Sequence, residues 1–174
     1  MKRLILSIAC GICTVTSDAQ TDKQPHPNVI FIYADDLGYK DLSCTGSRFY
    51  ETPHIDKLAR EGVCFTQSYA ACPVSSPSRA ALLTGKYPAR INLTDYIPGD
   101  RAYGPHKNQR LASLPFNLHL SKDEITMAEA FRQNGYSTFM AGKWHLAESA
   151  EYYPEQNGFD INIGGNNTGH PSKG

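Results

Sequence analysis

The sequence predicts an α/β fold built on a mainly parallel sheet. Three observations carry this prediction: an apolar run that ends in two carboxylates, stretches with clear helix start and stop signals, and apolar segments that follow those helices. Strands that alternate with helices in this way are typical of parallel sheets covered by helices. The 174-residue chain has a formal net charge of zero and its basic residues are scattered, so neither nucleic acid nor an acidic membrane surface is expected as a partner.

The N-terminus has the pattern of a cleavable secretory signal. A basic pair at residues 2–3 precedes an apolar stretch over residues 4–15, and small residues follow at 17–19. We therefore expect residues 1–19 to be removed, leaving a secreted or periplasmic protein. The apolar stretch is shorter than the roughly 18 or more residues that span a bilayer, and no later segment is long and apolar enough to do so.

The first expected strand covers residues 28–34 and ends at Asp35 and Asp36. A near-continuous apolar run is typical of a strand covered on both faces. Ligands gather at the carboxyl ends of such strands, where paired aspartates offer hard oxygen ligands for Ca²⁺ or Mg²⁺. A turn or helix cap is the alternative use of the pair, because aspartate bonds readily to local backbone N–H groups.

A helix is expected over residues 53–61, with Thr52 as its cap and Gly62 as its stop. A short strand over residues 63–65 should follow. Later in the chain, Thr126 and Glu129 form a capping box that predicts a second helix, ending before a glycine and leading into a strand through residue 139. The polar, proline-containing stretch over residues 92–124 predicts a long irregular loop.

The run from Ser75 to Gly85 places a hydroxyl, a proline and an arginine around one helix start. Pro77 suits the first turn, and the apolar residues after it continue the helix into a core. Ser75 is expected just before the positive end of this helix, where free N–H groups favour an anion, and Arg79 adds a cation one turn on. An ordinary capped helix is the alternative interpretation.

A third motif, Gly142-Lys143-Trp144-His145-Leu146, follows an apolar segment over residues 136–141. If that segment is a strand, Lys143 and His145 are two residues apart and share a face. Lysine offers a point charge for anionic oxygens, and histidine changes protonation near neutral pH. A solvated lysine and a structural histidine are the alternative.

Together these motifs resemble the signatures of the formylglycine-dependent sulfatases. The run from Ser75 is similar to C/S-x-P-S-R followed by L-T-G-R, with the serine of the bacterial type in place of cysteine and Lys86 where arginine is usual. The lysine keeps the charge but could weaken recognition by the modifying enzyme. Cys72 is out of register with the motif and is interpreted as a buried thiol. The family has an alkaline-phosphatase-like fold, with a central, mainly parallel mixed sheet between helices.

The resemblance implies that an anaerobic, serine-type maturation enzyme oxidises Ser75 to formylglycine. The hydrated aldehyde would use one hydroxyl to attack sulfur and the other to expel sulfate. Ca²⁺, preferred over Mg²⁺, would be bound by Asp35, Asp36 and residue 75. Catalytic roles would fall to Ser75, Arg79, Lys143 and His145. Lys143 and His145 would contact the sulfate and the bridging oxygen, and one of them would help to protonate the leaving alcohol.

The expected substrate is a sulfated carbohydrate. Residues 114–120 and the later glycine-rich stretch resemble the branch that acts on galactose or N-acetylgalactosamine sulfates. Thr168 and His170 fall where some relatives place substrate contacts, although a solvated loop is the alternative. Sulfatases are usually more than twice as long, so residues 20–174 are expected to be an incomplete N-terminal part of the catalytic domain. An inactive truncated fragment and a phosphoesterase-like member of the same superfamily remain as alternative functions.

Overall fold

The computed structural model describes residues 26–98 and 114–170. The predicted signal segment and the middle of the predicted loop over residues 92–124 lie outside the described residues. The chain divides into two units, residues 1–33 and 34–174. In the first unit, the described residues form neither helix nor strand. The neighbouring side chains of Phe31 and Ile32 are 56% and 84% exposed.

Two of the expected strands are therefore absent from the described part of the chain. Residues 28–34 and 63–65 have apolar sequences typical of strands, but no described segment forms a backbone ladder with either of them. Val63 and Phe65 are exposed like the residues of the first run. The predictions were wrong here because a strand requires a hydrogen-bonding neighbour, which local sequence does not specify.

Helix α1, Pro53–Glu61, begins and ends where the sequence predicts, with Thr52 as N-cap and Gly62 as C-cap. The Thr52 side chain does not cap the helix. Its hydroxyl donates instead to Asp56 Oδ1 (2.9 Å) and accepts from the backbone N–H of Ser43 (3.0 Å). These contacts tie α1 to the short 3₁₀ helix η1, Ser43–Thr45, and no residue of α1 is buried.

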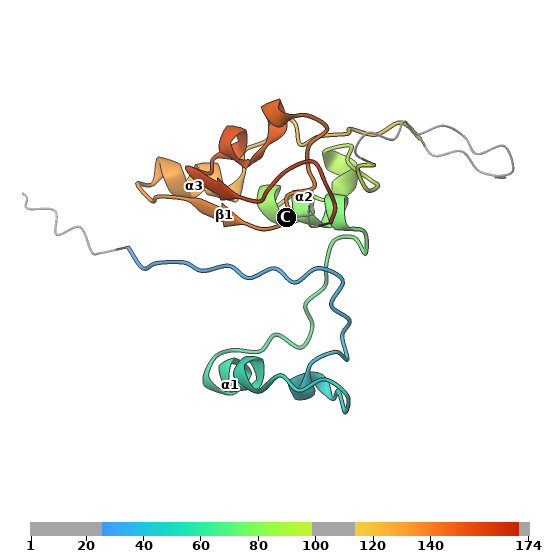
Figure 1. The fold of residues 1–174 in the computed structure, drawn as a ribbon, viewed down its shortest axis with the longest axis vertical. Helices are drawn as coiled ribbons and strands as arrows, with labels where there is room; N and C mark the ends of the chain where they lie inside the picture. The colour runs from blue at the N-terminus through green and yellow to red at the C-terminus, as the bar shows by residue number, and fades with distance from the viewer. Residues whose placement is uncertain (1–25, 99–113, 171–174) are drawn as a thin grey trace, which may run out of the picture. The chain divides into compact units, whose positions relative to one another are not determined.

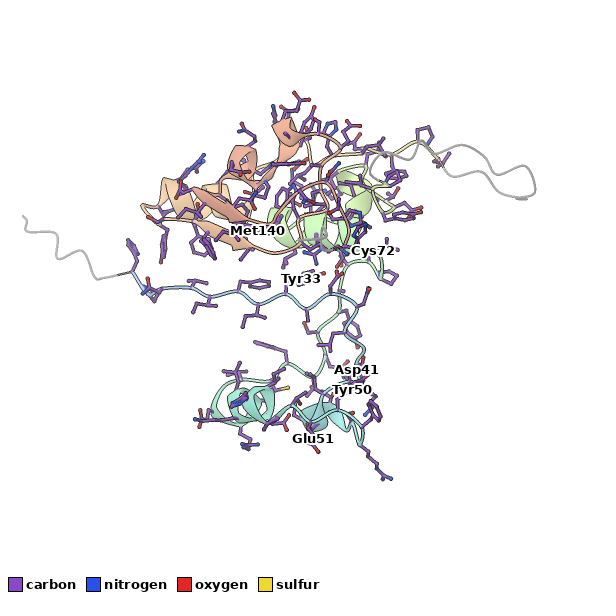
Figure 2. The ribbon with its side chains drawn as sticks, viewed as in Figure 1. Tyr33, Asp41, Tyr50, Glu51, Cys72 and Met140 are labelled. Atoms are coloured by element: carbon purple, nitrogen blue, oxygen red, sulfur yellow. The ribbon has the colours of Figure 1, made fainter. Side chains whose placement is uncertain are left out.

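The other elements surround one hydrophobic core. Strands β1, Phe139–Ala141, and β2, Ile161–Ile163, lie side by side (Figure 1) and pair in parallel. In their register Phe139 is opposite Ile161. Met140, labelled in Figure 2, packs against the core, whereas its neighbour Phe139 is exposed. The remaining elements are α2 (Ser75–Thr84), η2 (Pro88–Arg90), α3 (Met127–Gln133), η3 (Ala150–Tyr152) and η4 (Pro154–Asn157).

The capping box predicted at Thr126 is confirmed. Thr126 Oγ1 accepts from the Glu129 N–H (3.1 Å), and Glu129 Oε2 accepts from the Thr126 N–H (2.8 Å). The same hydroxyl donates to the carbonyl of Asn157 (2.8 Å), so the start of α3 is also joined to the end of η4. This one residue therefore both begins a helix and fixes its place in the core.

Cys72, labelled in Figure 2, is half-buried rather than buried, and the cysteines of the described ranges are free thiols. Within residues 26–98 and 114–170, no helix is long and apolar enough to cross a bilayer.

Candidate active site

The candidate site is built at the start of α2. Ser75 is the first residue of this helix, with Val74 as N-cap, whereas the sequence predicts Ser75 just before it. Pro77 consequently stands third in the helix, a position it tolerates because the first four N–H groups have no partner within the helix. Most of α2 is buried, so its positive end is rigidly placed beside residue 75.

His145 lies directly against Ser75. Its Nδ1 is 2.9 Å from the Ser75 Oγ, and its Nε2 is 2.7 Å from the carbonyl oxygen of Ile97. A carbonyl only accepts hydrogen bonds, so Nε2 must carry the hydrogen. In the neutral ring, Nδ1 is then the acceptor that faces the hydroxyl of residue 75.

The surroundings of His145 favour the neutral ring. Burial lowers its pKa, and the nearby positive charges of Lys143 and Arg79 lower it further, against the opposing effects of the Ile97 carbonyl and Asp35. At neutral pH the imidazole is therefore available to accept a proton at Nδ1.

Asp35 joins the two cations of the site. Its Oδ1 accepts from Arg79 (2.9 Å) and its Oδ2 accepts from Lys143 (2.7 Å). Arg79 also donates to the backbone carbonyl of Lys143 (2.7 Å), which links α2 to the segment after β1. Burial raises the pKa of Asp35, but the hydrogen bonds and positive charges of Arg79 and Lys143 outweigh it and hold that pKa below its usual range.

The predicted motif residues after β1 converge by a different route from the one expected. The strand ends at Ala141, Gly142 has φ +104°, and His145 itself has a left-handed backbone with φ +57°. Lys143 and His145 therefore do not share a strand face. A bend at Gly142 and the irregular segment after it place Lys143 against Asp35 and His145 against Ser75, and the glycine permits the positive φ at which the strand ends.

The structure does not gather the donors predicted for a cation: Asp36 is exposed, and the two carboxylate oxygens of Asp35 accept from Arg79 and Lys143. Within the described residues, no group of three or more His, Cys, Asp or Glu side chains is arranged to hold a metal ion. The carboxylates of Asp35 and Asp36 and the oxygen of residue 75 are the hard donors that Ca²⁺ prefers, but an ion that takes about 6 to 8 oxygens needs more of them. The residues present fit Ca²⁺ in chemistry as part of a ligand set.

Three residues of the site lack a signal in the sequence. The backbone N–H of Ile97 donates to Ser76 Oγ (3.0 Å), so the residue after Ser75 holds the segment whose carbonyl contacts His145. On the other side, Gly169 lies so close that an added Cβ would be 2.6 Å from His145 Cε1. Ile97 itself lies in the segment that the sequence predicts as an irregular loop, yet it is only 1% exposed. In the sequence, its apolar side chain next to a proline is the one feature that suggests it could be buried.

The loop around Thr168 satisfies its own polar groups. The Thr168 hydroxyl lies 2.6 Å from Asn166 Oδ1 and 2.9 Å from the carbonyl of His170.

In the motif that begins at Ser75, Lys86 forms an ion pair with Glu124.

Comparison with known proteins gives a consistent picture. The family model described as Sulfatase matches residues 27–173. The chain is 41% identical over 149 residues to the steryl-sulfatase of Rattus norvegicus, covering 80% of this chain and 24% of that protein. It is 44% identical over 120 residues to the N-acetylgalactosamine-6-O-sulfatase of Bacteroides thetaiotaomicron, covering 69% and 20% respectively.

A similar solved structure is that of Ps i-CgsB in complex with k-i-k-neocarrahexaose. It matches with a TM-score of 0.61 and 36% identity, over 72% of this chain and 25% of that one. The described residues therefore have part of the alkaline-phosphatase-like fold predicted from the sequence. The chain spans about a quarter of the length of the curated relatives it matches, since the first of these are covered over 24% and 22%.

Proposed function

This chain belongs to the sulfatase family, and on that premise we propose that it carries part of the active site of an enzyme that hydrolyses sulfate esters. The observation that carries the proposal is the contact between Ser75 and His145 Nδ1 (2.9 Å) at the positive end of α2, beside the Arg79–Asp35–Lys143 cluster. A hydroxyl, a proton acceptor and two cations at one helix start suit a reaction that places negative charge on a sulfuryl group.

Formylglycine at position 75, once hydrated, would supply one hydroxyl to attack sulfur, which breaks the bond from sulfur to the ester oxygen and releases the alcohol; loss of the proton from the other hydroxyl would then expel sulfate and restore the aldehyde. His145 Nδ1 takes the proton from the hydroxyl of residue 75, since Nε2 is already engaged with the Ile97 carbonyl. This geometry favours His145 as the proton acceptor rather than as the donor to the leaving alcohol. Lys143 and Arg79 oppose the negative charge of the sulfuryl oxygens, and Asp35 fixes their positions.

A divalent cation, proposed as Ca²⁺ rather than Mg²⁺, would be held by Asp35, Asp36 and residue 75 together with further ligands. When bound, it would add positive charge against the sulfuryl oxygens. The oxidation of Ser75 would require a serine-type maturation enzyme that recognises the motif around it.

The proposed substrate is a sulfated polysaccharide bearing galactose or N-acetylgalactosamine sulfate. Two relatives support this class: one is named for N-acetylgalactosamine 6-O-sulfate, and another binds a neocarrahexaose. A secreted or periplasmic location, reached through the predicted signal at residues 1–19, would give access to such polymers.

The test joins mass spectrometry to kinetics on the full-length protein from its native host. We expect the peptide containing Ser75 to lack two hydrogens, and N-acetylgalactosamine 6-sulfate or galactose sulfate to lose sulfate. Ser75→Ala should abolish turnover, whereas Ser149→Ala, which removes an exposed hydroxyl that makes no capping hydrogen bond at the start of η3, should leave it nearly unchanged. An unmodified serine with hydrolysis of phosphate esters alone would refute the proposal.

A further inference from the structure

Ser76 belongs to a closed chain of hydrogen bonds beside the site. Its hydroxyl oxygen accepts from the Ile97 N–H (3.0 Å), the Ile97 carbonyl accepts from His145 Nε2 (2.7 Å), and His145 Nδ1 meets Ser75 Oγ (2.9 Å). The peptide bond between Ser75 and Ser76 closes the ring. Each contact depends on the position of the next, because both ends of the chain belong to the rigid start of α2.

Three of the four residues in this chain are shielded from water, and Ser75 is half-buried. Ser76 is fully buried, Ile97 is 1% exposed and His145 is 7% exposed. Water therefore does not readily replace a lost hydrogen bond at Ile97 or His145. The Ser76 oxygen is the acceptor that the structure provides for the Ile97 N–H, and buried N–H groups are almost always paired.

The imidazole is also confined on its remaining side. The backbone of Gly169 lies against it, close enough that an added Cβ would fall 2.6 Å from Cε1 and 2.9 Å from Nε2. The His145 backbone is left-handed, with φ +57°, and its N–H donates to the Asn166 carbonyl (3.2 Å). A non-glycine residue keeps such a conformation when its surroundings hold it there.

We propose that Ser76 is a positioning residue that sets the tautomer of His145 through the backbone of Ile97. By holding the Ile97 N–H, Ser76 fixes the backbone of this residue so that its carbonyl, in the next peptide group, points at Nε2; this keeps the hydrogen on Nε2 and leaves Nδ1 to accept from residue 75. The role of this tautomer in turnover rests on the proposed function, but the tautomer itself does not.

The experiment uses the full-length protein labelled with ¹⁵N histidine, whose ring nitrogen shifts in NMR separate the two tautomers at one fixed pH. We expect the wild type to show the Nε2–H form at His145 and Ser76→Ala to show a mixture. Ser76→Thr, which keeps the oxygen, should restore the single form. Ser149→Ala is the control, because it removes an exposed hydroxyl at the start of η3, outside this chain of contacts.

Kinetics on the same variants give a second readout. Ser76→Ala should lower kcat about 10- to 100-fold, the range found for groups that orient metal-ligating histidines, with little change in KM. If Ser76→Ala does not fold, Ser76→Cys replaces it, because the thiol fills a similar space but is a weak acceptor. His145 should then show a mixture of tautomers in Ser76→Cys.

The outcomes separate this inference from the proposed function. A single Nε2–H tautomer in a folded Ser76→Ala or Ser76→Cys protein overturns the role of Ser76, whatever the activity. A mixed tautomer in that variant, restored by Ser76→Thr, supports it even if the wild type hydrolyses no sulfate ester. In that case the proposed function fails and the positioning role stands.

Discussion

Trp144 lies between Lys143 and His145, and its removal should test whether the core supports the site. Its side chain is 1% exposed, packs edge to face on Phe159 with ring centroids 6.1 Å apart, and donates from Nε1 to the Tyr152 carbonyl (2.9 Å). Replacing a buried tryptophan with alanine costs about 3–5 kcal/mol, because packing is lost and a cavity remains. Against a typical total of about 5–15 kcal/mol, this is a large loss.

The assay is urea unfolding of the protein and its variants, followed by the sulfatase assay. With a slope near 2 kcal/mol per molar, Trp144→Ala should lower the urea midpoint by about 2 M. Trp144→Phe keeps a ring but loses one hydrogen bond, so it should cost about 1–2 kcal/mol. The Tyr152 carbonyl keeps its second partner, Asn157 Nδ2 (3.0 Å), which limits that cost.

Tyr87 provides the control, because it is an aromatic residue that is 71% exposed. Tyr87→Ala should change the free energy of unfolding by less than about 0.5 kcal/mol. If Trp144→Ala lowered the free energy of unfolding as little as Tyr87→Ala, Trp144 would not stabilise the core as the structure indicates. Packing of Trp144 could then not be what positions Lys143 and His145.

Three further predictions follow. Asp36→Asn should weaken Ca²⁺ binding measured by calorimetry without distorting the backbone, because asparagine tolerates the φ of +55° at this position; unchanged affinity would remove Asp36 from the ligand set. Thr126→Ala should cost about 1–2 kcal/mol in thermal unfolding, since the cap of α3 and the bond to Asn157 are both lost, whereas Thr126→Ser should restore most of it; equal losses would contradict the capping role. Hydrogen bonds from the backbone and side chain of Thr138 lower the pKa of Asp160. The contribution of Asp160 to folding stability should therefore be present above the pKa of the carboxyl in the unfolded chain and be lost as the pH falls through its pKa in the folded protein. Asp160→Asn should flatten that part of a plot of urea midpoint against pH, and an unchanged plot would argue against this contribution.

Local signals in the sequence predicted the helices well. Proline and glycine limits predicted α1 to the residue, and the capping box predicted the start of α3. These signals work because caps and stops depend on contacts within a few residues. Strand prediction fared worse: residues 28–34 and 63–65 have strand-like sequences but no ladder in the described part of the chain. Pairing depends on distant segments, so apolar pattern alone does not settle it.

The sequence by itself predicted which residues should carry chemistry, and those roles stay predictions. The structure brings five of the predicted residues into contact around the start of α2: Ser75, Arg79, Lys143, His145 and Asp35. This was possible because each motif combines reactive side chains with the turn or helix signals that present them.

Only the tertiary structure decided how these groups are oriented. The bend at Gly142 replaced the expected strand face, and the Ile97 carbonyl determined which nitrogen of His145 faces Ser75. The contacts of Ser76 and Gly169 were likewise invisible in the sequence. The first joins two residues that are 21 positions apart, and the second depends on the close approach of a backbone without a side chain. A tautomer is set by the group that the far nitrogen meets, and that group is chosen by packing rather than by neighbouring residues.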